Sequence, residues 1–470
     1  MRVLAFDFGA SSGRAMLGTF DGEKIEMKEL SRFANEPVEV NGMLYWDVLR
    51  LFHELKRGIA LAEADGGADC IGIDTWGVDF GLLDENGTLL SNPLHYRAAL
   101  TEGAEETLAA RMSAQELYAE TGIAFNRYNT LCQLAMLQKS GSVPLKNART
   151  ALFMPDLFTY FLTGKAVCEH SIASTSQMLR AGCPAFSEKV SGAFGLKGLF
   201  PPVTPSGTVA GYLRADIVRE LGLKKSIPVA AALGHDTAAA FFAAPAEGQN
   251  AAILSSGTWS LLGTVLEKPV VCEEARKAGY TNEIAFGGKV RFLRNVVGLW
   301  IIQECRRSWE KEGIRLSFAE IAAGAEKVAP NRFFIDPDAE EFFAPHDMPR
   351  KVAAYCERQG GEVPRTVFEI ARCVYDSLAF AYKRALCDLE KLTGRKFDAL
   401  HIVGGGSNND MLNRATANAL GIRVTAGPGE ATALGNMLCQ LIALGAVKGE
   451  AQAHEIARRS GQVREFLPEI

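Results

Sequence analysis

A strand–turn–strand pattern opens the chain at residues 3–20, which read VLAFDFGASSGRAMLGTF. We expect strands over residues 3–7 and 15–20, because both runs are apolar and a stretch rich in Gly and Ser separates them. The pattern returns near mid-chain, where residues 251–265 read AAILSSGTWSLLGTV. This repeat, without close identity, indicates a second domain that begins as the first one does.

Length and composition fit a protein of this kind. The chain has 470 residues, enough for two or three domains. With 48% hydrophobic and 22% charged residues, it is typical of soluble globular proteins with a sizeable core. A net charge of −5 gives no electrostatic reason to expect a nucleic acid or an anionic membrane as a partner.

The sequence also predicts a location in the cytoplasm. No apolar run approaches the roughly 18 to 20 residues that cross a bilayer, and Asp7 interrupts the first apolar run too early for a signal peptide. The ten cysteines are scattered without a Cys-x-x-Cys pair, and the seven histidines show no zinc-ligand spacing. We therefore expect buried thiols in a reducing compartment and no zinc site.

Strands and helices alternate along the rest of the chain. We expect further strands at residues 70–74, 80–83, 227–233 and 400–403, and helices at 47–59, 131–137, 296–309, 374–389, 409–420 and 430–444. Residues 166–207 are rich in Ser, Thr, Gly and Pro, and no regular structure is predicted there. A boundary is expected at residues 247–250, which gives domains 1–246 and 247–470.

One strand leads to a candidate catalytic carboxylate. The apolar residues 227–233 run directly into Gly234-His235-Asp236-Thr237. Open α/β sheets place their ligand sites at the carboxyl ends of strands, so Asp236 is a candidate for chemistry. An Asp at a strand-to-helix turn is equally the usual choice for a helix N-cap. The local sequence leaves both interpretations open, and the two roles are compatible.

Three turns of small residues, each after a strand, predict a site for phosphates. They are residues 9–13, 255–258 and 404–407. Backbone N–H groups can approach a phosphate closely where no large side chain intervenes. Neither the P-loop nor the G-x-G-x-x-G pattern occurs, so the sequence indicates a nucleotide held in another way, with its phosphates between two domains. Asp7, at the end of the first strand, could hold Mg²⁺ through water or could only form the turn.

Five of these stretches occur in the order that is typical of a known family. They are residues 6–14 (FDFGASSGR), 72–80 (GIDTWGVDF), 234–237 (GHDT), 254–260 (LSSGTWS) and 401–406 (HIVGGG). Together they resemble the FGGY family of carbohydrate kinases, from about Val3 to Leu444. The resemblance implies an α/β fold of two actin-like, ribonuclease-H-type domains with ATP and a sugar in the cleft between them.

The resemblance also implies roles for single residues. Asp236 would be the general base that deprotonates the attacking sugar hydroxyl. The expected sugar-binding residues are Gly77, His235, Asp236, Thr237 and Asn295. The expected nucleotide-binding residues are Ala10, Ser11, Ser12, Gly13, Arg14, Thr258, Gln303 and Gly405, with Mg²⁺ as a cofactor near Asp7. Asn295 and Gln303 are expected about two turns apart on one helix, which would then contact both ligands.

The expected activity is ATP-dependent phosphorylation of a ketose, with L-rhamnulose at its O1 hydroxyl as the first candidate. L-Fuculose, L-ribulose and D-xylulose are the alternatives, because a few pocket contacts separate such substrates. The alternative from another class is a filament-forming or chaperone-like ATPase of the actin type. Asp236 and the segment around Trp76 favour the enzyme. Expected partners are only the small sugar and ATP, for a monomer or small homo-oligomer.

Some of these residues also have a plainly structural interpretation. His235 could be a core histidine whose hydrogen bonds are satisfied, and Trp76 could simply pack in the core. Arg14 could reach a phosphate or could pair with an acidic surface residue.

Overall fold

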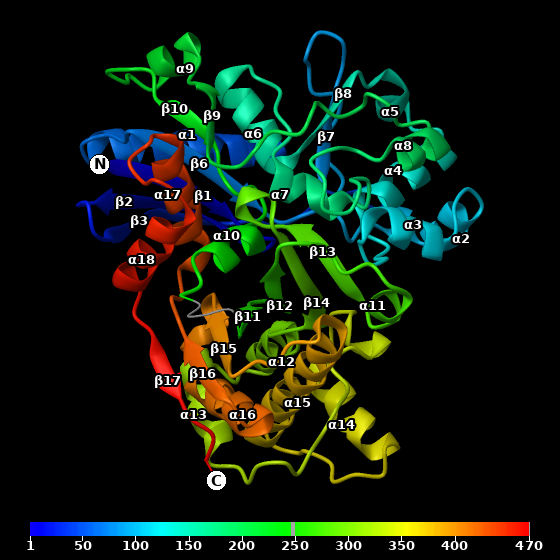
Figure 1. Ribbon diagram of the computed structural model, residues 1–470. Helices are drawn as coiled ribbons and strands as arrows, with labels where there is room; N and C mark the ends of the chain where they lie inside the picture. The colour runs from blue at the N-terminus through cyan, green and yellow to red at the C-terminus, as the bar shows by residue number, and fades with distance from the viewer. Residues whose placement is uncertain (246–249, 470) are drawn as a thin grey trace. The chain divides into compact units, whose positions relative to one another are not determined.

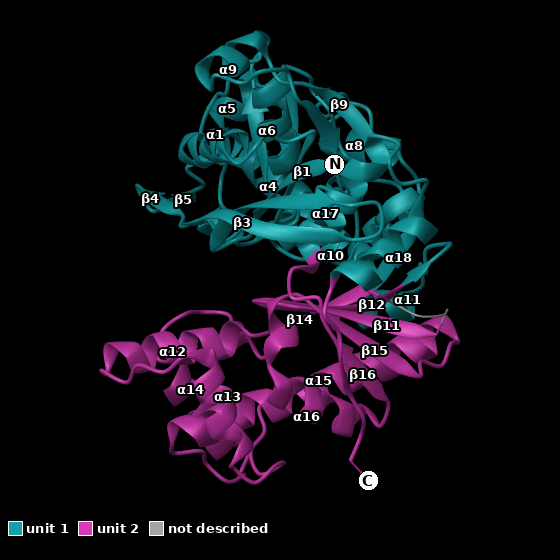
Figure 2. Cartoon of the chain, turned by 90° about the vertical axis from the view of Figure 1, so that its left-hand side faces the viewer, with its two compact units in different colours: residues 1–243, 265–292, 432–460 teal, residues 244–264, 293–431, 461–470 magenta. Residues whose placement is uncertain are grey.

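The computed structural model describes residues 1–245 and 250–469, which form two compact units (Figure 2). Unit 1 contains residues 1–243, 265–292 and 432–460, and unit 2 contains residues 244–264, 293–431 and 461–470. The units are thus discontinuous in sequence, whereas the expected domains are continuous. The expected boundary is at residues 247–250, and residues 247–249 lie outside the described residues. No helix among the described residues is long and apolar enough to span a membrane.

Unit 1 is built on a six-stranded sheet in the order β3-β2-β1-β6-β10-β9 (Figure 1). The strands are β1 (Arg2–Phe8), β2 (Ser12–Phe20), β3 (Ile25–Ala34), β6 (Cys70–Thr75), β9 (Thr208–Tyr212) and β10 (Pro228–Ala231). The first hairpin is confirmed, since β1 and β2 pair antiparallel. Strands β1, β6 and β10 run parallel, so their carboxyl ends lie at the same edge of the sheet.

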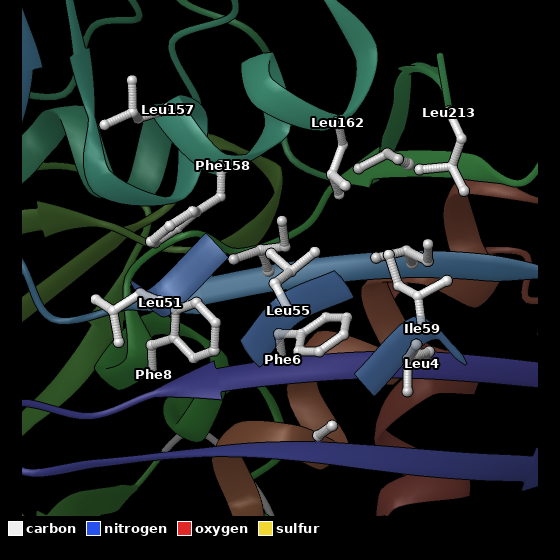
Figure 3. Close-up of a cluster of buried hydrophobic side chains, with 14 of the residues drawn as sticks. Leu4, Phe6, Phe8, Leu51, Leu55, Ile59, Leu157, Phe158, Leu162 and Leu213 are labelled. Atoms are coloured by element: carbon white, nitrogen blue, oxygen red, sulfur yellow. The ribbon is translucent and has the colours of Figure 1, made fainter. Parts of the chain in front are cut away.

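Two helices cover an apolar layer on this sheet. Helix α1 (Val48–Ala64) begins as predicted at Asp47, whose carboxylate accepts a hydrogen bond from the backbone N–H of Arg50. Its apolar face and that of α6 (Met154–Thr163) pack on β1, where the rings of Phe8 and Phe158 meet edge to face at 5.1 Å (Figure 3). Each fully buried side chain of this size contributes about 1.5 to 3 kcal/mol to folding. The core thus fixes the strands that carry the site.

Unit 1 contains further strands and α-helices. They are β4 (Val38–Val40), β5 (Met43–Tyr45), β7 (Phe80–Leu83), β8 (Thr150–Phe153), α2 (Ala104–Ala109), α3 (Ala114–Thr121), α4 (Thr130–Lys139), α5 (Val143–Asn147), α7 (His170–Ala173), α8 (Glu188–Phe194), α9 (Ala215–Glu220), α10 (Asp236–Phe242), α11 (Glu273–Lys277), β13 (Tyr280–Ile284) and α18 (Glu450–Ser460). Helix α17 (Ala431–Ala443) also lies in unit 1, apart from its first residue.

Residues 166–207 contain regular structure that the sequence did not predict. The carboxylate of Glu169 accepts hydrogen bonds from the N–H groups of Ser171 and Ile172 and so caps α7. The next hydroxyls bond back to carbonyls three residues earlier, as Ser174 does to Ser171 at 2.7 Å. Side-chain capping therefore organises this segment, and such capping leaves no apolar periodicity in the sequence.

Unit 2 contains most of a seven-stranded sheet in the order β13-β14-β12-β11-β15-β16-β17. Its strands are β11 (Ala251–Ser256), β12 (Trp259–Leu266), β14 (Val290–Val297), β15 (Ala399–Val403), β16 (Arg423–Ala426) and β17 (Arg464–Phe466). Its main helices are α12 (Trp300–Lys311), α13 (Phe318–Glu326), α14 (Met348–Arg358), α15 (Val367–Thr393) and α16 (Asp410–Leu420). The second hairpin is confirmed by the antiparallel pairing of β11 with β12. Strand β13 and the first residues of β14 belong to unit 1.

The predicted helix 296–309 is wrong in its first part. Val296 and Val297 end strand β14, and the helix begins only at Trp300. Between them Gly298 packs so closely that a Cβ atom there would lie 2.6 Å from Ser260 Oγ. Two β-branched residues before such a contact favour a strand.

Candidate active site

Three carboxylates gather at the carboxyl edge of the unit 1 sheet. Asp7 and Asp74 are partners in the parallel pairing of β1 with β6, and Asp236 follows β10. Burial and the neighbouring Asp7 raise the pKa of Asp74 well above its usual range. Burial and Asp7 also raise the pKa of Asp236. A cluster of this kind attracts positive charge.

Asp236 is the first residue of α10, and the N-cap position belongs to His235. Asp236 Oδ1 accepts hydrogen bonds from Thr237, at 2.6 Å from the backbone N and 3.1 Å from Oγ1. The Asp236 side chain remains 31% exposed. It therefore does not occupy the predicted cap position, and a ligand can reach it.

The backbone of the turn before Asp236 is held from two sides. Gly234 donates its N–H to Glu169 Oε2 at 3.0 Å and accepts a hydrogen bond from the N–H of Thr75 at 2.9 Å. The N–H of His235 lies 3.3 Å from Ser171 Oγ, which itself donates to Glu169 Oε2 at 2.6 Å. Glu169 thus positions both α7 and the turn. Glu169 lies within residues 166–207, where no regular structure is predicted, so the sequence gives no signal for its role.

The imidazole of His235 contacts three charged residues. Its Nδ1 lies 3.0 Å from Arg291 Nη2 and 3.1 Å from Glu283 Oε2, and its Nε2 lies 3.4 Å from Asp236 Oδ1. Burial alone would raise the pKa of Glu283, but it is lowered to about 2, and the adjacent Arg291 guanidinium is the largest cause of the lowering. Both charged partners come from the β13–β14 hairpin and were also missed. A histidine in this setting belongs to a polar network and not to an apolar core.

The first predicted phosphate turn lies directly after Asp7. Gly9 donates its N–H to the carbonyl of Ser12 at 2.9 Å, and Asn35 Nδ2 donates to the carbonyl of Gly9 at 2.8 Å. Arg14 forms an ion pair with Asp7, the site carboxylate. Ala10 and Ser11 thus lie within the turn that the Gly9–Ser12 hydrogen bond closes, and Ser12 and Gly13 are the first two residues of β2.

Gly77 lies in the loop between β6 and β7, beside a strained residue. Val78 has a φ of 68°, a left-handed conformation that is rare and costly for a β-branched side chain. Two hydroxyls hold it, since Val78 donates its N–H to Thr175 Oγ1 at 3.1 Å and accepts from Thr130 Oγ1 at 2.6 Å. Strain of this kind is found mainly at ligand sites.

The same loop is anchored by the buried carboxylate of Asp79. Its Oδ2 accepts from the indole N–H groups of Trp46 and Trp76 at 2.6 and 2.9 Å, and its Oδ1 accepts from Gln133 at 2.7 Å. Burial raises the pKa of Asp79 to about 7 despite these donors. Trp76 is thus both a core residue and part of the frame around Gly77.

In unit 2 the second predicted turn and α12 lie together. Thr258 Oγ1 is 3.3 Å from Gln303 Oε1. The backbone N–H groups of Leu299 and Trp300 donate to the carbonyls of Gly257 and Thr258 at 2.9 and 3.2 Å. The structure therefore brings together the predicted nucleotide residues Thr258 and Gln303.

The third turn packs against the second. A Cβ atom on Gly406 would lie 2.0 Å from Ser256 Oγ, whereas one on Gly405 would meet no atom within 4 Å. Asn295 lies in β14, a strand, so the expected single helix carrying Asn295 and Gln303 is wrong. Asn295 belongs to unit 2, whereas Gly77, His235, Asp236 and Thr237 belong to unit 1.

Cavities and metal ligands do not locate the site. Two cavities in unit 2, of about 520 and 480 Å³, contain none of the predicted site residues in their walls. Within residues 1–245 and 250–469 no three His, Cys, Asp or Glu side chains are arranged to hold a metal ion. The site is defined by its carboxylates and turns.

Comparison with known proteins identifies the family. The models for the N-terminal and C-terminal domains of the FGGY family of carbohydrate kinases match residues 2–243 and 252–444. The chain is 40% identical to rhamnulokinase from Bacteroides thetaiotaomicron, over 99% of this chain and 95% of that protein. It is 41% identical to rhamnulokinase from Enterococcus faecalis, over 95% of this chain and 90% of that protein.

Solved structures confirm the expected fold. The crystal structure of ligand-bound xylulose kinase from Lactobacillus acidophilus superposes with a TM-score of 0.83 at 16% identity, over 100% of this chain and 94% of that one. Glycerol kinase from Plasmodium falciparum with ADP gives 0.79 at 16% identity, with the same coverage. By sequence and by fold, the chain belongs to the FGGY family of carbohydrate kinases.

Proposed function

We propose that this kinase transfers the γ-phosphoryl group of ATP to the O1 hydroxyl of L-rhamnulose. The curated relatives that match nearly the whole chain are rhamnulokinases, which supports this ketose over L-fuculose, L-ribulose and D-xylulose. The mechanism rests on the position of Asp236. Its carboxylate is partly exposed, and the turn before it is fixed by hydrogen bonds with Glu169 and Thr75.

Asp236 is proposed as the general base. As the sugar O1 attacks the γ-phosphorus, its proton passes to Asp236, the new O–P bond forms, and the bond to the β,γ-bridging oxygen breaks to release ADP. The raised pKa makes the ionised form of Asp236 a stronger base than an ordinary Asp carboxylate. Its hydrogen bonds from Thr237 use Oδ1 and leave Oδ2 for the sugar hydroxyl.

The other predicted residues keep their roles as parts of this proposal. We assign Gly77, His235, Thr237 and Asn295 to the sugar. We assign Thr258, Gln303, Gly405 and the turn from Ala10 to Arg14 to the nucleotide. The close pair of Thr258 and Gln303 and the open space at Gly405 support this assignment in unit 2.

Magnesium enters as the ion bound to ATP. Asp74 Oδ1 is buried without a hydrogen-bond partner, and Asp7 and Asp74 repel each other electrostatically. A divalent cation near them would relieve this repulsion, and oxygen ligands suit Mg²⁺. Because Asp7 already pairs with Arg14, we expect contact through water. A cytoplasmic location is part of the same proposal, since it suits free cysteines.

A panel of ketoses with ATP tests the function. ADP release should depend on L-rhamnulose and exceed the rate with L-fuculose, L-ribulose and D-xylulose.

Asp236→Asn should lower kcat by at least about 10³-fold while ATP still binds, because it removes the base and keeps the shape of the side chain. The exposed Asp216→Asn is the matched control. ADP release without any sugar would instead support an actin-like ATPase.

A further inference from the structure

The hairpin of β13 and β14 brings a charged pair to the back of His235. The Arg291 side chain is completely buried, and those of Glu283 and His235 are each 9% exposed. Arg291 Nη2 lies 2.8 Å from Glu283 Oε2 and 3.0 Å from His235 Nδ1. A buried guanidinium only donates hydrogen bonds, so each of its two polar neighbours must present an acceptor to it.

The donors and acceptors around the ring favour one tautomer. A guanidinium only donates hydrogen bonds, so Arg291 requires an unprotonated Nδ1 on His235. The proton then lies on Nε2, which faces the acceptor Asp236 Oδ1 at 3.4 Å. The other tautomer would satisfy only Glu283, at 3.1 Å, and would set a donor against Arg291 and a lone pair against Asp236. Two of the three contacts therefore support a proton on Nε2. In the third, the Nδ1 lone pair faces Glu283 Oε2, whose charge is compensated by Arg291 at 2.8 Å.

Arg291 itself is held in one orientation. Its Nε donates to the carbonyl of Ile284 at 3.1 Å, and Nη2 donates to Glu283. The guanidinium also lies over the ring of Phe241, 5.7 Å from its centroid. Because Phe241 is on α10, the helix that starts at Asp236, the pair contacts both His235 and the element that follows it. Its planar fork cannot rotate away from Nδ1 without breaking these contacts.

We propose that Arg291, fixed by Glu283, is a positioning residue that keeps the proton of His235 on Nε2, so that the ring donates toward Asp236 and the bound sugar. This inference rests on the proposed function, in which Asp236 is the base. A donor on this side keeps Asp236 Oδ1 occupied, together with Thr237, and directs Oδ2 to the substrate hydroxyl. Neither Arg291 nor Glu283 touches the reacting atoms in this scheme.

The direct test is nuclear magnetic resonance of ¹⁵N-histidine-labelled full-length protein without sugar or ATP. The His235 signals are assigned by their loss in His235→Asn. We expect an Nε2–H tautomer in the unsubstituted chain. The double variant Glu283→Gln/Arg291→Met removes both buried charges together, because Arg291→Met alone would leave Glu283 unpaired and could prevent folding. It should shift His235 to a mixture of tautomers or to Nδ1–H.

Steady-state kinetics of the same variants are the second measurement. The double variant and the conservative Arg291→Lys should lower kcat for L-rhamnulose by about 10- to 100-fold, with KM for ATP unchanged. The matched control is Glu273→Gln/Arg276→Met, which removes a partly exposed Arg–Glu pair of the same unit, with N and O atoms 2.6 Å apart. It should leave both the His235 tautomer and kcat unchanged.

Two results would overturn the inference. One is an Nδ1–H tautomer in the unsubstituted chain, and the other is a folded double variant with unchanged tautomer and kcat. The tautomer is read without substrate, so failure of every ketose in the panel would refute the proposed function and leave this result intact. An Nδ1–H tautomer in an active kinase that loses activity in Asp236→Asn would refute only the role of Arg291.

Discussion

Gly405 and Gly406 are adjacent in the third turn but have different surroundings. Their substitution can therefore distinguish a role in ligand binding from a role in folding. A Cβ atom on Gly405 would enter open space, whereas one on Gly406 would lie 2.6 Å from the Cβ of Ser256. The sequence GGG alone cannot distinguish them. Only the packing of the β15 turn on the end of β11 shows which glycine is required by the protein itself.

Gly405→Val should weaken ATP binding at least about tenfold and leave the melting temperature nearly unchanged, because the added side chain meets only a ligand. Gly406→Ala should destabilise the protein by about 1 to 3 kcal/mol, since it overpacks against Ser256. Calorimetric titration with ATP and thermal denaturation measure the two effects. Equal losses of stability in both variants would refute a nucleotide role for Gly405.

Glu283 should make stability depend on acid. Its pKa is about 2 in the folded chain and 4.5 as the reference value, so the ionised group stabilises the fold above pH 4.5. That stabilisation is lost as the pH falls from 4.5 toward 2. The stability difference between the unsubstituted chain and Glu283→Gln should therefore shrink by about 1 kcal/mol between pH 7 and pH 4.

Urea unfolding at the two pH values measures this difference. The control is Glu273→Gln, which removes a partly exposed ion pair with Arg276 that solvent screens. A difference for Glu283→Gln that stays constant with pH would show that the carboxylate is not held ionised by Arg291.

At the scale of elements, the sequence predicted what is local. The hairpin at residues 3–20 and the start of α1 at Asp47 follow from apolar runs and a capping residue. The start of α12 was placed too early, because the close packing of Gly298 on Ser260 is a long-range contact. Asp236 and the phosphate turns could be named from their motifs, whereas Glu169, Glu283 and Arg291 carry no motif and reach the site only through the fold.

Helices α10 and α17 pack through their backbones. A Cβ atom on Gly435 of α17 would lie 1.9 Å from the carbonyl oxygen of Ala239 in α10. The next residue, Asn436, donates to Asp74 Oδ2 at 2.6 Å. Helix α17 therefore sets the position of α10, and with it Asp236, relative to the carboxylates of the sheet.

Gly435→Ala should force α10 away and lower both stability, by about 1 to 3 kcal/mol, and kcat, by about 100-fold. The control is Gly192→Ala in α8, where the new methyl group would make only ordinary contact with Lys197. That change should be neutral or stabilising by up to about 1 kcal/mol, as for Gly to Ala in a helix. Thermal denaturation and steady-state kinetics measure both variants, and a fully active, stable Gly435→Ala would contradict the role given to α17.

At the scale of the whole molecule, unit 1 cannot be completed by the first half of the chain. It takes β13 and the start of β14 from residues 265–292, and α17 and α18 from residues 432–460. These later segments supply Glu283 and Arg291 behind His235, and Asn436 beside Asp74. Gln440 Nε2 of α17 also donates to the carbonyl of Leu4 in β1 at 3.1 Å.

A fragment of residues 1–246 should therefore fail to fold cooperatively, although it contains the whole six-stranded sheet. Helix α17 packs closely on the sheet at Gly72, where a Cβ atom would lie 2.2 Å from Asn436 Oδ1. Without α17 this face of the sheet would be open to water, and Asp74 would lose the hydrogen bond that Asn436 donates. Circular dichroism and thermal denaturation compare this fragment with the full chain. Co-expression with residues 247–470 should restore a cooperative transition and ketose-dependent ADP release. If the fragment alone melted near the temperature of the full chain, the later segments would be additions to unit 1 and not part of its folding core.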